Sequence, residues 1–311
     1  MCQLSIVVIT LNEEERISMC LESLIQEAEN INSEIILVDS MSDDNTIEIA
    51  KEYPVEVYQI KKEKYRSPAM GRAVGQNVAA GDNILFVDGD IVVSQGWLPE
   101  ALDYLREKSN LAGITGPLNT DTGLDKPHQV ERVSGVMLFD ANKLGAVGGF
   151  DPSIKGAEDH ELSYRLTNYG YNLIELPYSV GYHPRRDYVK KPLRRLKRGY
   201  YLGTGQILRK HINNPTVMKN HIMDQNKDIA SVLWIFSGLL TIIFQRKSLQ
   251  VLWASISFIV LLVLSKKKGT IKTMMYPIDA TIKFVNSIYG FIVHKNSEEE
   301  FRIGEKYDKV N

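Results

Sequence analysis

The chain has 311 residues, 44% hydrophobic and 24% charged, which is a composition for a folded protein with room for one large domain or a domain plus an appendage. Its formal net charge of −1 provides no global basic field, so we expect no nucleic acid partner. The two cysteines, Cys2 and Cys20, are too few for a disulfide framework or a cysteine-based zinc site. The amino terminus lacks the basic and long apolar segments of a signal peptide, so we expect the catalytic part to stay in the cytoplasm.

Strands and helices alternate along the first part of the chain. Apolar, β-branched runs predict strands at 6–10, 34–39, 55–60 and 84–87. Helical spacing of apolar residues, with Pro near one start and Gly after one end, predicts helices at 13–28, 42–53 and 68–80. This alternation predicts an α/β fold with a doubly wound, mostly parallel sheet.

Polar side chains stand where three of the predicted strands end: Thr10 with Asn12, then Asp39, then Asp88 with Asp90. Ligands of such sheets bind beyond the carboxyl ends of the strands, so we expect these residues to share one crevice. No Gly-x-Gly-x-x-Gly follows the first strand and no Gly-x-x-x-x-Gly-Lys-Ser/Thr occurs, which argues against dinucleotide and P-loop sites.

Asp88-Gly89-Asp90 is the most informative of these groups. Residues i and i+2 of a strand point the same way, so the two carboxylates leave the sheet on about one side. Two hard oxygen donors suit Mg²⁺ or Mn²⁺ that neutralises a phosphate. Asp-Gly is also a common turn dipeptide, and these residues alone leave both interpretations open.

Six segments, taken together and in this order, resemble the family 2 glycosyltransferases, which are inverting enzymes of the GT-A fold. The resemblance runs from Ser5 to about Lys210. The segments that carry it are 5–13, 36–46, 71–79, 85–90, 148–151 and 158–159.

The resemblance implies a site for a nucleotide-sugar donor, either UDP- or GDP-linked. Thr10, Asn12 and Asp39 would hold the base and its ribose. Arg72 would contact the diphosphate with its fork of donors, and Asp88 would lie near the ribose. The plainer alternatives are a turn cap for Asp39 and a surface helix charge for Arg72.

The resemblance also implies a metal site and a catalytic base. Asp90 would bind Mg²⁺ or Mn²⁺ between the two phosphates, and His183 would be a second metal ligand or a diphosphate contact. Asp159 would be the general base that deprotonates the acceptor hydroxyl, while Glu158 is expected to be structural or to bind the acceptor. Acids at a helix start are also favoured simply by the helix dipole, and a lone histidine before a proline is often a loop residue.

Two departures from the family pattern narrow the expected reaction. Ala73 follows Arg72 where the family often has asparagine. Residues 195–199 stand where processive relatives carry Gln-x-x-Arg-Trp, and they contain neither the glutamine nor the tryptophan. We therefore expect transfer of a single sugar.

The end of the chain is basic and then hydrophobic. Eight Lys and Arg residues fall within 185–198, and they would contact a diphosphate, a phosphate-bearing acceptor or anionic lipid headgroups, with a solvated helix face as the alternative.

The uncharged runs 229–244 and 249–264 each span roughly 24 Å at ~1.5 Å per residue, short of the ~30 Å hydrocarbon thickness. We favour a spanning or re-entrant membrane hairpin over a soluble helical subdomain or dimer interface. We expect residues 274–293 to form an interfacial amphipathic helix and residues 295–311 to be a frayed tail.

The predicted organisation is a catalytic domain at 1–210 and a helical membrane-associated region at 211–311. We expect a metal-dependent inverting glycosyltransferase at the cell membrane, with its catalytic domain facing the cytoplasm. Its acceptor would be a saccharide, most simply a lipid-linked one in surface glycan synthesis. The competing hypotheses are a sugar-nucleotide nucleotidyltransferase and a non-catalytic membrane scaffold on the same fold.

Overall fold

The computed structural model describes residues 3–183, 190–268, 270–294 and 303–310. The chain divides into two compact units, the first formed by Met1–Pro184 with Ser297–Asn311 and the second by Arg185–Asn296. The sequence predicts a boundary after residue 210. In the structure the boundary lies earlier in the chain, because α7 (Lys190–Lys197) and α8 (Leu202–Lys210) belong to the helical unit.

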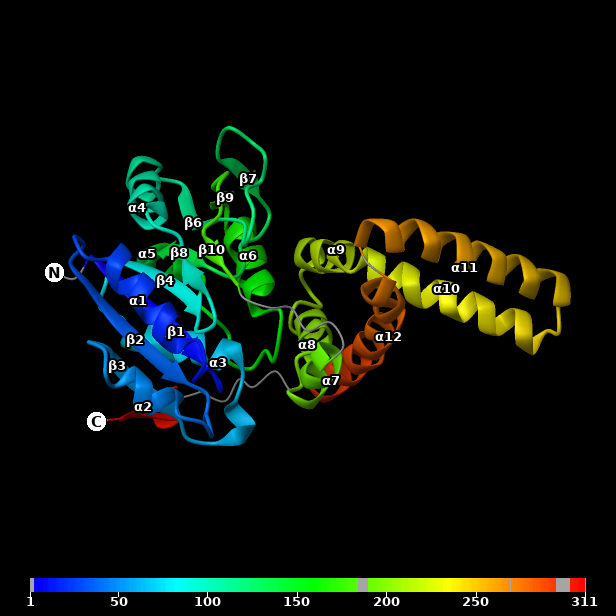
Figure 1. The fold of residues 1–311 in the computed structure, drawn as a ribbon, viewed down its shortest axis with the longest axis horizontal. Helices are drawn as coiled ribbons and strands as arrows, with labels where there is room; N and C mark the ends of the chain where they lie inside the picture. The colour runs from blue at the N-terminus through cyan, green and yellow to red at the C-terminus, as the bar shows by residue number, and fades with distance from the viewer. Residues whose placement is uncertain (1–2, 184–189, 269, 295–302, 311) are drawn as a thin grey trace. The chain divides into compact units, whose positions relative to one another are not determined.

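A nine-stranded sheet forms the core of the first unit, as Figure 1 shows. Its order is β11-β3-β2-β1-β4-β8-β6-β9-β7. The strands are β1 (Leu4–Thr10), β2 (Ser33–Asp39), β3 (Glu56–Ile60), β4 (Asn83–Asp88), β6 (Leu111–Thr115), β7 (His128–Val130), β8 (Met137–Asp140), β9 (Asn172–Glu175) and β11 (Tyr307–Val310). Strands β1 to β4 are mutually parallel, which confirms the predicted parallel sheet, and β8 runs antiparallel to β4 and β6. A separate two-stranded sheet pairs β5 (Val92–Val93) with β10 (Gly181–Tyr182).

Helices flank both faces of this sheet. They are α1 (Ile17–Glu27), α2 (Thr46–Ala50), α3 (Pro68–Val78), α4 (Trp97–Glu107), α5 (Ala141–Ala146) and α6 (Glu158–Tyr169), with a short 3₁₀ turn η1 (Glu63–Tyr65). Alternate residues of β1 enter opposite cores: Ile6 and Val8 join the cluster that contains α1 and α4, and Val7 joins the one that contains α3 and α6. Strand β1 is thus buried on both faces, as its continuous apolar run predicts.

Helices α1 and α2 are shorter than the sequence predicts. The residues expected to form their first turns instead make hydrogen bonds within and between the loops that precede the two helices. Helix α1 begins at Ile17 rather than at residue 13. Glu14 instead accepts hydrogen bonds from the backbone and side chain of Asn45, at 3.1 and 2.9 Å. Asp44 accepts one from the backbone N–H of Thr46, the first residue of α2, at 3.0 Å.

The end of the chain is ordered where the structure describes it. Residues 303–310, expected to be frayed, form a 3₁₀ turn η2 (Ile303–Glu305) and β11, which pairs antiparallel with β3. The ring of Tyr307 packs edge-on against Tyr58 at 5.6 Å between centroids, and Lys61 lies 2.8 Å from Asp308. The expectation was wrong for these residues, because β3 would otherwise be an open edge with unpaired backbone groups.

The second unit is entirely helical in its described residues. Besides α7 and α8 it contains α9 (Pro215–Asp224), α10 (Asn226–Ile243), α11 (Lys247–Lys268) and α12 (Thr270–Val293). By length and composition alone, helix α10 is long and apolar enough to cross a membrane, and α11 has a shorter apolar stretch, Lys247–Val260. Residues 185–189 of the basic segment predicted at 185–198 lie outside the described residues, and Lys190–Lys197 form α7.

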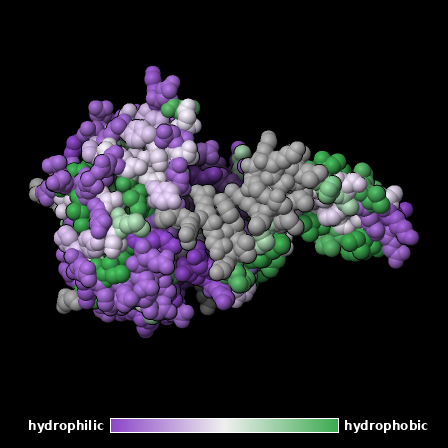
Figure 2. Space-filling view, in the orientation of Figure 1, coloured by the Kyte–Doolittle hydropathy of each residue, from purple (hydrophilic) through white to green (hydrophobic). Residues whose placement is uncertain are grey.

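Large apolar side chains are exposed along α10 and α11. They include Leu233 at 61%, Phe236 at 56% and Phe258 at 61% exposed, and Figure 2 shows the hydrophobic surface they help to form. Between the two helices, Trp234 stacks on Trp253 at 5.7 Å between ring centroids. A contiguous apolar surface of this kind is typical of a membrane or protein contact.

Candidate active site

Thr10 and Asp39 meet at the carboxyl ends of β1 and β2, where the strand register pairs them. Asp39 is fully buried and accepts hydrogen bonds from Thr10 Oγ1 at 3.2 Å, from the backbone N–H of Ser42 at 2.8 Å and from Gln59 Nε2 at 3.1 Å. Such bonds hold a carboxylate in one orientation. Gln59 and Ser42 were not singled out in the sequence, because their part here depends on the pairing of β2 with β3 and on the loop after β2.

Asn12 lies in the loop after β1 with a left-handed backbone, at φ 59°. Asparagine tolerates this conformation better than most residues. Its side chain donates to Asp43 and accepts from the backbone N–H of Asp43 at 3.1 Å, while its own N–H donates to Ser42 Oγ at 2.8 Å. Asn12 therefore ties the loop after β1 to the loop after β2, beside Asp39.

Arg72 is buried, with 4% of its surface exposed, and projects from α3. Its Nη2 lies 2.8 Å from Asp88 Oδ1, its Nη1 forms an ion pair with Glu158, and its guanidinium lies 5.8 Å from the centre of the Phe150 ring. The sequence predicts that Arg72 contacts a diphosphate. In the structure its guanidinium is already in contact with two carboxylates. Glu158, assigned no firm role in the sequence, joins the site through this pair.

The charges around Arg72 do not balance locally. Burial raises the pKa of Glu158, Arg72 opposes this, and the neighbouring Asp159 adds to the rise. One guanidinium faces Asp88 and Glu158 with Asp159 nearby, which leaves an excess of negative charge. A cation or a proton is favoured at such a position.

Asp90 and His183 form the second pair of the site. His183 Nε2 lies 3.1 Å from Asp90 Oδ2, and the backbone N–H of His183 donates to Asn119 Oδ1 at 2.9 Å. The pairing of β5 with β10 brings the two residues together, since Asp90 precedes β5 and His183 follows β10. Both side chains are partly exposed, at 23% and 28%.

The contact between Asp90 and His183 shifts the pKa of each residue in the direction that favours an ion pair. The hydrogen bond to Asp90 raises the pKa of His183 against an opposing effect of burial. Burial, the largest influence, would raise the pKa of Asp90, but the hydrogen bond and charge of His183 outweigh it and the pKa is lowered. The ionised carboxylate of Asp90 suits a Mg²⁺ or Mn²⁺ ion that takes other ligands from phosphates and water, and His183 in its neutral form would offer a nitrogen ligand beside it. Among the described residues no group of three or more His, Cys, Asp or Glu side chains is placed to hold a metal alone.

Asp159 stands in the first turn of α6 and is half-buried. Its Oδ1 accepts from the backbone N–H of His160 at 2.9 Å, and the turn before it is made by Ala157 with a left-handed backbone at φ 61°. This turn sends Glu158 into the buried contact with Arg72 while Asp159 remains partly open to solvent. Neighbouring acids in the sequence therefore have different environments.

A second arginine fastens the loop before α6. Arg165 bonds Glu161 through Nε at 2.8 Å, donates to the backbone oxygen of Gly149 at 2.6 Å and also donates to that of Val147. Gln76 Oε1 accepts from the backbone N–H of Phe150 at 3.1 Å. The sequence signal for Arg165 was only its place four residues after Glu161, since its backbone partners lie in another segment.

Comparison with known proteins supports the resemblance. Residues 5–152 match the family model described as glycosyl transferase family 2. The chain is 31% identical over 114 residues to a dolichol-phosphate mannosyltransferase of Pyrococcus furiosus, covering 35% of this chain and 32% of that protein. It is 27% identical to the succinoglycan biosynthesis protein ExoA of Rhizobium meliloti, over 66% of this chain and 70% of that one. It is 21% identical to the glycosyltransferase AglE of Haloferax volcanii, over 76% and 81%.

Solved structures support the fold. The mannosyltransferase PcManGT of Pyrobaculum calidifontis, solved with GDP-Man and Mn²⁺, superposes with a TM-score of 0.67 at 17% identity, over 91% of this chain and 87% of that one. Residues 1–349 of S. aureus TarS give a TM-score of 0.51 at 20% identity, over 68% and 72%. The predicted GT-A architecture is confirmed. Through residues 5–152, just under half of its length, the chain is similar to the family 2 glycosyltransferases.

Proposed function

We propose that this enzyme moves a single sugar from a nucleotide-sugar donor to an acceptor hydroxyl, with inversion at the anomeric carbon and with a divalent metal ion. The observation that carries the proposal is the Asp90–His183 pair, 3.1 Å apart and partly exposed, at the edge of the sheet where the acids of β4 end. Names of relatives agree with this class of reaction, since they include a mannosyltransferase and proteins of glycan synthesis.

The nucleoside would bind at the ends of β1 and β2. Asp39 would accept a hydrogen bond from the base, held in place by Thr10, Ser42 and Gln59. Asn12 would shape the neighbouring loop through its bonds to Asp43. A structural neighbour was solved with GDP-Man, and assays with UDP- and GDP-linked donors distinguish the two bases.

The diphosphate would lie near Asp90 and His183. When bound, Mg²⁺ or Mn²⁺ would neutralise the charge that develops on the leaving diphosphate. Asp90 and His183 would hold that ion, while Asp88 would face the ribose. Arg72 would act chiefly by fixing the carboxylates of Asp88 and Glu158, because its guanidinium is buried between them.

Asp159 would serve as the general base. It would take the proton of the acceptor hydroxyl as that oxygen bonds to the anomeric carbon, while the bond from that carbon to the phosphate oxygen breaks and the nucleoside diphosphate leaves with the electron pair. Attack opposite the leaving group inverts the configuration. The partly open position of Asp159 in the first turn of α6 supports this role.

The helical unit would attach the enzyme to a membrane with the catalytic unit on its cytoplasmic side. The exposed apolar side chains of α10 and α11 support attachment, as does the length of α10. The acceptor would then be a saccharide on a lipid carrier, consistent with the dolichol-phosphate enzyme among the relatives.

Transfer assays test the proposal directly. Membranes that contain the full chain are incubated with radiolabelled UDP- and GDP-sugars, with and without EDTA, and lipid-extracted products are counted. We expect label to move from one donor, to stop with EDTA and to return with Mn²⁺. Transfer that ignores the chelator would exclude the metal role, and pyrophosphate-dependent exchange without transfer would favour a nucleotidyltransferase.

A further inference from the structure

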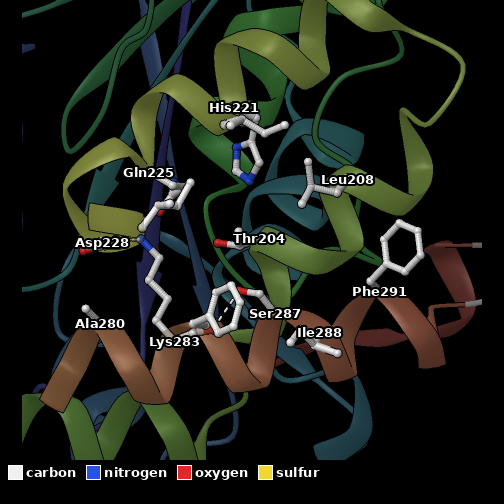
Figure 3. Close-up of a pocket in the computed structure, with 13 residues that line it drawn as sticks. Thr204, Leu208, His221, Gln225, Asp228, Ala280, Lys283, Ser287, Ile288 and Phe291 are labelled. Atoms are coloured by element: carbon white, nitrogen blue, oxygen red, sulfur yellow. Dashed lines mark hydrogen bonds and ion pairs between the residues drawn. The ribbon is translucent and has the colours of Figure 1, made fainter. Parts of the chain in front are cut away.

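The helical unit contains a cavity of about 250 Å³ that the catalytic site does not use. Helices α8, α9, α10 and α12 line it, and Figure 3 shows side chains from these helices around it. A 150 Å³ apolar cavity is already enough for a benzene-sized molecule, so this one has room for part of a hydrocarbon chain.

The wall of the cavity is mainly apolar and reaches the surface. Leu208, Ile229 and Phe291 contribute to it, together with Phe284 and Ile288, which are 44% and 49% exposed. Half-exposed side chains on the wall show that the cavity opens outward. Its chemistry favours an apolar occupant over a sugar or a nucleotide.

The charged residues at the cavity are arranged asymmetrically, because Asp228 and Lys283 line it whereas Arg209 lies next to its wall. Lys283 lies 2.7 Å from Asp228, and Tyr276 donates to the same carboxylate at 2.7 Å, so this side carries a paired charge. Arg209, which is exposed, lies over the ring of Phe291 at 5.5 Å. The guanidinium therefore sets a positive charge next to the apolar wall, where an anionic head on an apolar chain would be attracted.

The same helix that lines the cavity also carries the apolar surface. Asp228 and Ile229 of α10 line the cavity, and Leu233 and Phe236, one and two turns further along, are 61% and 56% exposed. A lipid in contact with the exposed part of α10 would thus be close to the opening. On these grounds the occupant we commit to is a lipid of the surrounding bilayer.

We infer that this cavity binds one hydrocarbon chain of an anionic membrane phospholipid, with the phosphate beside Arg209. None of the residues assigned to sugar transfer lines this cavity, and its occupation requires neither donor nor metal. Binding would hold α8, α9, α10 and α12 around a lipid as a fixed part of the membrane-attached enzyme.

Photolabelling of the full chain tests the inference. The protein is reconstituted in phosphatidylcholine vesicles that contain phosphatidylglycerol with a diazirine at the end of one acyl chain, irradiated without nucleotide, and mapped by peptide mass spectrometry. We expect label on the peptides that contain Ile222 and Phe284. The same diazirine chain on phosphatidylcholine should label these peptides several-fold less.

Two tryptophan variants on α12 separate the cavity from the general lipid contact. Ile288→Trp should fill the opening and remove most of this label, whereas Ile292→Trp, on a side chain that is 72% exposed and does not line the cavity, should retain it. Arg209→Gln should abolish the preference for phosphatidylglycerol. Circular dichroism confirms that each variant is folded before it is scored.

Several results would overturn the inference. Equal labelling of the two tryptophan variants would show that the chain only touches the helix surface. Equal labelling by the two phospholipids would remove the role of the anionic head. Displacement of the label by a polyisoprenyl phosphate, but not by unlabelled phosphatidylglycerol, would assign the cavity to a lipid-linked substrate. Loss of sugar transfer in a separate assay would bear on the proposed function and leave the labelling result unchanged.

Discussion

Arg72 and Asp88 form an ion pair at 2.8 Å in which the guanidinium is almost entirely buried. The same guanidinium holds Glu158, which is 86 residues away in sequence. A single side chain on α3 therefore connects the end of β4 to the first turn of α6. The carboxylates expected at the donor and acceptor sides of the reaction are positioned by one shared cation.

Replacing Arg72 should destabilise the protein as well as inactivate it. Arg72→Gln leaves a buried Glu158 without its cation, and breaking a buried pair from one side costs about 3–5 kcal/mol. Urea unfolding of the variant measures this loss. Arg106→Gln is the matched control, because its pair with Asp103 is exposed on α4 and should contribute less than about 1 kcal/mol. A loss for Arg72→Gln no larger than the control would contradict the bridging role.

Asp90→Asn and His183→Gln should each weaken activation by metal. We expect the Mn²⁺ concentration for half-maximal transfer to rise at least about tenfold, since each variant would remove one of the two protein ligands in the proposed metal site. A Mn²⁺ titration of the transfer rate gives the number. Asp82→Asn, an exposed acid in the same unit, should leave the titration unchanged. An unaltered titration in both site variants would place the metal elsewhere.

Asp159→Asn should slow the chemical step while donor binding persists. Loss of a general base reduces the rate by about 10²–10⁴-fold. Steady-state transfer gives kcat, and a thermal shift with nucleoside diphosphate and Mn²⁺ reports binding. If kcat stays within about threefold of the parent, another group must take the proton.

Low pH should destabilise the loop after β2, because it protonates Asp44. Burial, the largest influence, would raise the pKa of this carboxyl, but hydrogen bonds from the side chain of Thr46 and the backbone of Glu14 and Thr46 outweigh it, so the pKa is lowered. A lowered folded-state pKa gives stability that is complete above the unfolded value of about 4 and is lost as the pH falls through the folded value. The unfolding free energy should drop more steeply below about pH 4 in the parent than in Asp44→Asn. Parallel curves for the two proteins would contradict this.

Tyr307→Ala should loosen the edge of the sheet. The change removes the ring contact with Tyr58 and the hydrogen bond from Asn77, worth about 1–3 kcal/mol together. Because Asp308 is paired with Gln59, whose amide bonds Asp39, nucleotide binding should weaken as well. Denaturant unfolding and a nucleotide thermal shift measure the two effects. Lys309→Gln is the control, because it removes an exposed pair with Glu56 and a cation–π contact with Tyr58 at 5.7 Å but keeps the Tyr307 ring in place.

The parallel half of the fold was predictable from sequence because its strands are continuous apolar runs. The ends of β1, β2 and β4, with Thr10, Asp39 and Asp88, follow from those runs and from the parallel register. The antiparallel β8 was not predictable, since it lies beside β4 only in the folded sheet.

The remainder of the site depends on contacts between distant segments. Asp90 meets His183 through two-residue strands that are too short to give a periodic signal. The pairing of Arg72 with Glu158 likewise has no local signature, and an arginine on a helix is ordinarily expected to be exposed. Strand β11 was missed because a short charged segment resembles a tail until an open edge strand is available to pair with it.

The pairing of β11 with β3 has a practical consequence for anyone who dissects this protein. The chain leaves the catalytic unit, forms the helical unit and then returns, so the helical unit is an insertion rather than an extension. A stop codon placed after β10 would remove the sheet's outermost strand along with the helices. A minimal catalytic fragment therefore needs an internal excision that rejoins the chain ahead of η2, and a terminal affinity tag belongs at the amino end.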